Sequence, residues 1–117
     1  MNDRVTQSDK IRTVTSETFA SLVLDGQGPI VVEFMSYACA YCGAIEPILQ
    51  QVAEIMKSQA KIFRVNIGIE HELANSYEIS GTPTLVMFLN GSEVGRVDGP
   101  SPVLSDVLAT ITQAFEQ

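Results

Sequence analysis

The sequence predicts an α/β domain in which a central mixed β-sheet of about five strands is flanked by about four helices. Segments rich in β-branched and apolar residues alternate along the 117-residue chain with segments whose apolar residues recur every third or fourth position. An Asn-Gly turn between two strand-like segments near the end adds an antiparallel hairpin. The length fits one domain with its own core. We therefore expect the element order β-α-β-α-β-α-β-β-α.

The first third of the chain predicts an edge strand, a helix and a central strand. Lys10–Val14 alternates weakly between polar and apolar residues, as an edge strand does. Thr15 can cap a helix over Ser16–Leu24, which the turn-forming residues of Asp25–Pro29 would end. Ile30–Met35 is β-branched and almost continuously apolar, which is typical of a strand covered on both faces.

A long amphipathic helix is predicted from Cys39 to about Ser58. Pro47 lies inside this helix and should bend it, because proline lacks a backbone N–H and crowds the preceding turn. The apolar stripe of the helix consists of Ile45, Ile48, Leu49, Val52, Ala53 and Met56.

The second half of the chain predicts two helices and three strands. In order, these are a strand over Lys61–Ile67, a short helix over Glu70–Tyr77, a hairpin of Thr84–Leu89 and Glu93–Val97 around Asn90 and Gly91, and a last helix that begins at Ser101 and Pro102.

Composition and charge limit the partners that we expect. Residues 1–10 are polar and predict a flexible tail before a domain over residues 11–117; they include no apolar segment of the secretory type, so we expect a cytoplasmic protein. The longest nearly apolar run, Pro29–Met35, is far shorter than the ~20 residues of a membrane span, so no membrane contact is expected. A net charge of −7, with seven Lys and Arg residues spread along the sequence, argues against nucleic acid.

Cys39 and Cys42 are the only cysteines and are separated by Ala40 and Tyr41. Cys39 stands where a strand ends and a helix begins, so the free N–H groups of the first helical turn can point at its sulfur. These donors and the helix dipole should lower the pKa of the Cys39 thiol from ~8.5 into the range of about 3.5 to 7.5. Cys39 is then the nucleophile, and the more buried Cys42 is placed to resolve a mixed disulfide.

Two other interpretations of the pair remain open at this point. A structural zinc site needs four ligands, and His71 is the only histidine, so carboxylates or a second chain would have to complete it. A structural disulfide would close a very short loop and constrain the unfolded chain only a little. We expect no metal site.

The Cys-x-x-Cys pair, Pro47 and the segment Gly81–Thr84 together resemble the thioredoxin family, over about Ile11 to Phe115. The resemblance implies the thioredoxin fold and a cis peptide bond before Pro83. It also implies that Pro83 faces the cysteine pair and that the backbone of Thr82 pairs with an extended substrate segment. The loop of Gly99 would border the same groove. The implied substrates are protein disulfides, and the implied reductant is a thioredoxin-reductase-like protein or another thiol. We expect a monomer whose only redox centre is the Cys39–Cys42 disulfide, without any further cofactor.

Two departures from the family pattern lie beside the first cysteine. Ala38 stands where the family usually has tryptophan, and Ala40 and Tyr41 replace the usual Gly-Pro, although we still expect both to contact substrate. Position 41 thereby regains a backbone N–H, which we expect to reach the Cys39 sulfur and to lower its pKa by about one unit. A pair more oxidising than the ~−270 mV of thioredoxin is expected.

Glu33 stands six residues before Cys39, where the family usually has aspartate. Burial of a carboxylate in a covered strand should raise its pKa and make it a proton acceptor for Cys42 through a water molecule. Alternatively, Glu33 points into solvent at the end of the sheet. Arg64 on the neighbouring strand is a possible partner and would lower the pKa again.

The function predicted is that of a thiol-disulfide oxidoreductase in electron transport and cell redox homeostasis. Cys39 would attack protein disulfides and Cys42 would resolve the mixed disulfide. One alternative is glutathione-dependent exchange of the glutaredoxin kind, suggested by Tyr41. Another is a binding or chaperone module that keeps the fold without using the cysteines.

Overall fold

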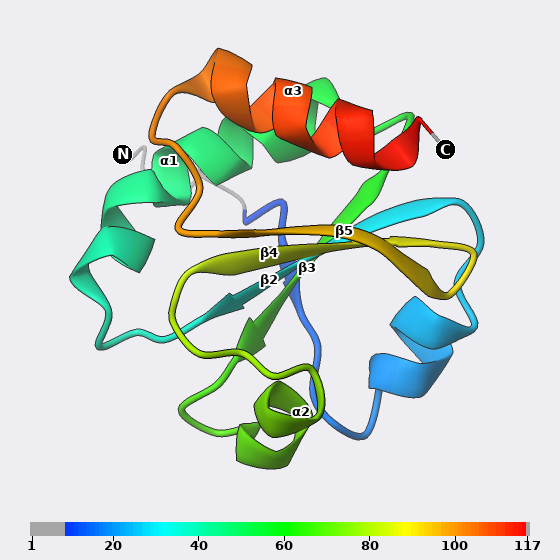
Figure 1. Cartoon of the computed structure of the whole chain (residues 1–117), viewed down its shortest axis with the longest axis vertical. Helices are drawn as coiled ribbons and strands as arrows, with labels where there is room; N and C mark the ends of the chain where they lie inside the picture. Colours follow the sequence, from blue (N-terminus) through cyan, green and yellow to red (C-terminus); the bar gives the residue numbers. More distant parts are fainter. Residues whose placement is uncertain (1–8, 117) are drawn as a thin grey trace, which may run out of the picture.

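A five-stranded mixed sheet with strand order β1-β3-β2-β4-β5 runs through the computed structural model, which describes residues 9–116 (Figure 1). The strands are β1 (Arg12–Thr13), β2 (Pro29–Met35), β3 (Lys61–Asn66), β4 (Thr84–Leu89) and β5 (Ser92–Asp98). The helical elements are η2 (Ala20–Leu24), α1 (Ala40–Ile55), α2 (His71–Ser76) and α3 (Leu104–Phe115). The predicted fold class and element order are confirmed.

The central strand β2 is parallel to β3 and antiparallel to β4. In this register Glu33 lies opposite Arg64 of β3 and Leu85 of β4. The register therefore places the one acidic residue of β2 beside a basic residue in the middle of the sheet.

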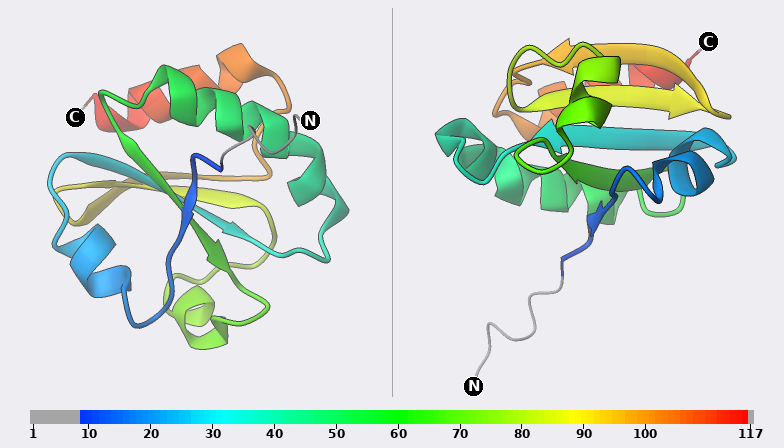
Figure 2. Two further views of the ribbon diagram at one scale, coloured as in Figure 1. Left: turned by 180° about the vertical axis from the view of Figure 1, so that it is seen from behind. Right: turned by 90° about the horizontal axis from the view of Figure 1, so that it is seen from below.

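Helices cover both faces of the sheet. Figures 1 and 2 show α1 and α3 together on one side, with α2 and the segment around η2 on the other. The first core contains Val31, Leu85 and Met87 of the sheet with Ile45, Leu49, Val52, Val107 and Ile111 of the two long helices. The second contains Val32, Phe34, Val86 and Phe88 with Phe19 and Val23, and Leu73 and Tyr77 pack against it. Because side chains alternate along a strand, Glu33 shares the α1 side of the sheet with Val31.

The first predicted helix is wrong in kind and extent. In place of an α-helix over residues 16–24, the chain forms a turn followed by the short π-helical segment η2. The side chain of Thr15 does not cap it; instead, the N–H of Thr15 donates to Oγ1 of Thr18, and the carbonyl of Thr15 accepts from Thr18 and Phe19. The hydroxyls of Thr18 and Ser21 each donate to the carbonyl three residues earlier, and such side-chain bonds compete with the regular hydrogen-bond ladder of an α-helix.

Smaller differences affect other element ends. The edge strand is shorter than predicted, and α3 begins at Leu104 rather than at Ser101, whose hydroxyl accepts from the N–H of Val103. The hairpin turn is as predicted: Asn90 and Gly91 both have positive φ, 52° and 87°, as a two-residue type I′ turn requires.

Residues 1–8 of the predicted tail lie outside the described residues. Asp9 and Lys10, which the prediction also assigned to the tail, contact the domain through Gln50 of α1. The N–H of Lys10 donates to Oε1 of Gln50 at 2.9 Å, and Nε2 of Gln50 donates to Oδ1 of Asp9 at 2.7 Å.

Four basic residues gather at one depression beside the edge strand rather than being spread over the surface. Lys10, Arg12, Lys57 and Lys61 line it, and all four are exposed. Charged side chains on an edge strand oppose pairing with the edge of another sheet. Within residues 9–116, no helix combines the length and the apolar character that crossing a membrane would need.

Candidate active site

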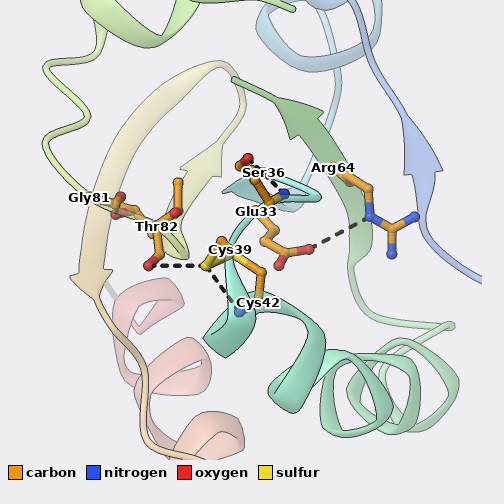
Figure 3. Close-up of a disulfide and its surroundings, with 9 residues drawn as sticks. Glu33, Ser36, Cys39, Cys42, Arg64, Gly81 and Thr82 are labelled. Carbon is orange, nitrogen blue, oxygen red and sulfur yellow. Dashed lines mark hydrogen bonds and ion pairs between the residues drawn. A yellow bond between two sulfur atoms is a disulfide. The ribbon is translucent and has the colours of Figure 1, made fainter. Parts of the chain in front are cut away.

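The cysteine pair lies at the junction between β2 and α1 (Figure 3). Cys39 is the N-cap of α1, with φ −89° and ψ 114°, as the sequence predicted, and it forms a disulfide with Cys42. Its sulfur accepts a hydrogen bond from the N–H of Cys42 at 3.1 Å. Cys39 is half-buried, whereas Cys42 is 2% exposed. The two sulfurs therefore differ in access to solvent, and the more accessible one sits at the helix N-terminus.

The backbone donor to the Cys39 sulfur is Cys42 and not Tyr41, which the sequence argument had assigned to this role. An N-cap side chain accepts from the second or third residue of the helix, and here the third is used. The expected rise in reduction potential depends on a Tyr41 donor to the Cys39 sulfur, and the observed donor is Cys42.

A loop with a cis peptide bond between Thr82 and Pro83 faces the pair, as the resemblance implied. The carbonyl oxygen of Thr82 lies 3.6 Å from the Cys39 sulfur, and Pro83 is buried. Oγ1 of Thr84, at the start of β4, donates to the carbonyl of Gly81 at 2.8 Å and fixes the loop to the strand. The loop therefore brings Thr82 next to Cys39 across the sheet.

The loop after β5 closes the site on another side. The N–H of Gly99 donates to the carbonyl of Pro83 at 2.9 Å, and the hydroxyl of Tyr41 donates to the carbonyl of Pro100 at 2.6 Å. Ala40, the first residue of α1, is exposed beside them. The bond from Tyr41 to Pro100 joins positions 59 residues apart, and no local sequence pattern indicates it.

Glu33 is fully buried, so the alternative of a solvated side chain at the sheet end is wrong. Neither of its carboxyl oxygens has a hydrogen-bond partner among the described residues, and the nearest cation, Nε of Arg64, is 3.8 Å from Oε1. Burial raises the pKa of Glu33 to about 7; Glu46 and Asp9 act in the same direction, while Arg64 opposes them. The predicted rise in pKa is confirmed, and the pairing with Arg64 is weaker than a hydrogen-bonded salt bridge.

Arg64 has stronger partners than Glu33. Its Nη1 donates to Oδ2 of Asp9 at 2.8 Å and to the carbonyl of Ile11 at 3.3 Å, and its Nη2 donates to Oε2 of Glu46. Sequence reasoning missed Asp9 and Glu46. Glu46 occupies a polar position of the α1 helix pattern, and Asp9 precedes the first strand, so neither is marked as part of a site.

A cavity of about 250 Å³ joins the cysteine pair to this charged group. Cys39 and Cys42 line one part of it, and Asp9, Glu46 and Arg64 line another. Among residues 9–116 there is no group of three or more His, Cys, Asp or Glu side chains arranged to hold a metal ion. The site thus combines a cysteine pair with a buried carboxyl group, and the cavity gives solvent access to both cysteines and to Arg64, the cation nearest to Glu33.

Comparison with known proteins shows similarity along almost the whole described domain. The chain matches the Thioredoxin family model over residues 10–113. It is 33% identical over 104 residues to thioredoxin 1 of Nostoc sp. The aligned region covers 89% of this chain and 92% of that protein. It is 34% identical over 95 residues to thioredoxin C-2 of Corynebacterium nephridii, with 81% of this chain and 88% of that protein covered.

A longer protein is also similar. The chain is 34% identical over 110 residues to the probable protein disulfide-isomerase A6 of Medicago sativa. The aligned region covers 92% of this chain but 30% of that protein. The chain thus spans less than a third of this relative and most of the length of the two thioredoxins. Because the matched region contains the close cysteine pair on which thiol-disulfide exchange depends, the chain belongs to the thioredoxin family and is a thiol-disulfide oxidoreductase.

Proposed function

We propose that Cys39 attacks the disulfides of protein substrates and that Cys42 resolves the mixed disulfide. The observation that supports these roles most directly is the position of the Cys39 sulfur, which caps α1 and accepts from the N–H of Cys42. Helix-terminal N–H groups and the helix dipole stabilise a thiolate there relative to a thiol. Cys39 is also the more accessible of the two.

The exchange proceeds in two steps. The Cys39 thiolate attacks one sulfur of the substrate disulfide, a disulfide between Cys39 and the substrate forms, and the other substrate sulfur leaves as a thiolate that takes a proton from solvent. Cys42 then loses its proton and attacks the Cys39 sulfur. The Cys39–Cys42 disulfide forms, the second substrate thiolate leaves, and two electrons have passed from the cysteine pair to the substrate.

Glu33 is proposed to accept the Cys42 proton through a water molecule. Its pKa of about 7 supports this role, because a base with a pKa near the working pH is available in its ionised form and still binds a proton. Its two oxygens are unoccupied by other donors in the described structure.

Substrate is proposed to bind at Ala40, Tyr41, Thr82, Pro83 and Gly99. The contacts of Cys39 with Thr82, of Gly99 with Pro83 and of Tyr41 with Pro100 support a continuous surface around the reactive sulfur. An extended segment placed there would bring its disulfide to Cys39.

The remaining parts of the proposal concern the setting of the reaction. We propose a monomer that works in the cytoplasm and receives electrons from a thioredoxin-reductase-like protein or another thiol. The cysteine pair is its own redox centre in this proposal, and no further cofactor takes part. Support comes from the family to which the chain belongs.

Reduction of insulin by dithiothreitol tests the function. The wild-type protein should accelerate precipitation of the reduced insulin chains, and Cys39→Ser should leave only the uncatalysed rate. Equal acceleration by the variant would rule out Cys39 as the nucleophile. No acceleration by the wild-type protein would favour a binding module, and activity with glutathione as reductant that exceeds activity with a reductase would favour the glutaredoxin-like alternative.

Alkylation of the reduced protein by iodoacetamide tests the helix-cap argument separately. The rate of Cys39 alkylation should follow a titration with a pKa about one unit or more below the ~8.5 of a free thiol. Mass spectrometry of the peptides distinguishes Cys39 from Cys42, which should react more slowly. A Cys39 titration like that of free cysteine would remove the reason for assigning it the attacking role.

A further inference from the structure

We propose that Asp9 and Glu46 are positioning residues of the exchange reaction: they bind the guanidinium group of Arg64 and thereby prevent it from neutralising Glu33. The inference rests on the proposed role of Glu33 as proton acceptor. It adds two residues that contact neither sulfur, one of which lies before the first strand of the domain.

The geometry of Arg64 supports this inference first. A guanidinium group can present two parallel N–H donors to one carboxylate and form a bidentate pair. Here the terminal nitrogens instead donate to Asp9, to the carbonyl of Ile11 and to Glu46. Only Nε is directed at Glu33, at 3.8 Å, which is too long for a hydrogen bond, and Nε itself has no hydrogen-bond partner among the described residues (Figure 3).

The distribution of charge supports it next. Three carboxyl groups surround a single guanidinium group, so full ionisation would leave a net charge of −2 in a largely buried region. The side chains of Asp9 and Glu46 are 56% and 32% exposed, and that of Glu33 is 1% exposed. Water can stabilise the first two as carboxylates, whereas Glu33 bears the cost of burial. Of the three carboxyl groups, Glu33 is therefore the one that binds a proton most readily.

The charged groups around Glu33 come from three parts of the chain. Arg64 lies on β3, Asp9 precedes β1, and Glu46 lies on α1, one turn after Cys42. The partner of Glu33 on β4 is the apolar Leu85. Burial raises the pKa of Glu33, as Glu46 and Asp9 do, and Arg64 is the only one of these groups that lowers it.

The cavity connects the charged groups around Arg64 with the cysteine pair. Cys42 shares its walls with Asp9, Glu46 and Arg64, so solvent that enters it reaches both the resolving cysteine and the guanidinium group. If Glu46 lost its charge, the positive charge of Arg64 would act more strongly on Glu33. An opposite charge within about 4–6 Å lowers the pKa of a carboxyl group by about 1–3 units.

The decisive variant is Glu46→Gln, which keeps the shape of the side chain and removes its charge. Glu54→Gln is the matched control, because Glu54 lies on the same helix but pairs with Lys57 and Lys10 on the surface. Two quantities are measured in reduced protein: the pH dependence of insulin reduction, and the titration of the Glu33 carboxyl carbon by NMR with ¹³C-labelled glutamate. We expect both midpoints to move down by about one pH unit in Glu46→Gln and to stay in place in Glu54→Gln.

A second arm shows whether the effect passes through Glu33. In a Glu33→Gln background, Glu46→Gln should cause no further change in the pH profile. Asp9→Asn removes the charge of the other carboxylate that binds Arg64 and should shift the midpoints in the same direction. This variant keeps the inference testable if Glu46→Gln folds poorly.

Each outcome decides between the inference and the function on which it rests. If Glu33→Gln removes the lower limb of the pH profile but Glu46→Gln and Asp9→Asn leave the wild-type midpoints unchanged, Asp9 and Glu46 have no positioning role and Glu33 keeps its own. If the shift persists in the Glu33→Gln background, it does not pass through Glu33, and the inference is wrong. If Glu33→Gln leaves the profile unchanged, Glu33 is not the proton acceptor, and both are wrong.

Discussion

Replacing Cys42 by serine should stop turnover and leave the protein joined to its substrate through Cys39. The first step needs only the Cys39 thiolate, whose position at the start of α1 the substitution does not change. The second step needs a thiol at position 42, because a serine hydroxyl cannot displace sulfur from a disulfide under these conditions. The mixed disulfide between Cys39 and the substrate should therefore accumulate, because no second thiol resolves it.

Mass spectrometry under non-reducing conditions measures this outcome. After mixing with an oxidised peptide substrate, Cys42→Ser should form an adduct that approaches one substrate fragment per chain, and reduction by dithiothreitol should release it. Cys39→Ser is the matched control and should form none, because Cys42 is almost fully buried. An adduct on Cys39→Ser but not on Cys42→Ser would reverse the two roles.

The backbone of the site could be predicted from local pattern, because each part of it depends on residues close together in the sequence. The apolar run that forms β2, the stripe of α1 and the junction between them place Cys39 at a helix N-terminus without knowledge of the rest of the chain. The burial of Glu33 follows from the same run, since a residue in the middle of a covered strand cannot reach water. The cis bond before Pro83 came from the family resemblance alone.

The surroundings of Glu33 could not be predicted in the same way. The sequence indicates Arg64 as a possible partner because it lies on a neighbouring predicted strand, but Asp9 and Glu46 reach Arg64 across 55 and 18 positions of the chain. A polar residue on the solvent side of a helix and one before the first strand fit their local patterns without any role in a site. Only the packing of α1 and the first residues onto β3 brings them together.

Two further predictions are wrong for local reasons: the backbone donor to the Cys39 sulfur and the α-helix after Thr15. The N-cap geometry selects the third helical residue, so the Cys39 sulfur accepts from Cys42 although Tyr41 also has a free N–H. Around η2, the hydroxyls of Thr18 and Ser21 donate to backbone carbonyls and compete with the α-helical ladder, and propensity rules give no measure of the strength of these bonds.

The second large effect expected is on stability: in oxidised protein, Glu33→Gln should gain stability relative to wild type as the pH rises. In the folded state the pKa of Glu33 is about 7, and its usual value in an unfolded chain is 4.5. Between these values the unfolded state releases its proton more readily than the folded state, so wild-type stability falls as the pH rises from about 4.5 to about 7. A difference of this size corresponds to about 3 kcal/mol at pH values above both.

Glutamine cannot ionise, so the variant lacks this pH dependence, and any cost of its buried amide is the same at every pH. Urea unfolding at about pH 4.5 and about pH 8 should therefore show the difference in unfolding free energy between variant and wild type changing by about 3 kcal/mol in favour of the variant. Oxidised protein is used so that no thiol titrates in this range. Glu54→Gln, which changes an exposed carboxylate of α1, should show no comparable change over the same interval. A constant difference between Glu33→Gln and wild type at the two pH values would mean that the pKa of Glu33 is the same in the folded and the unfolded protein. Glu33 would then lack the pKa near neutrality on which its role as proton acceptor depends.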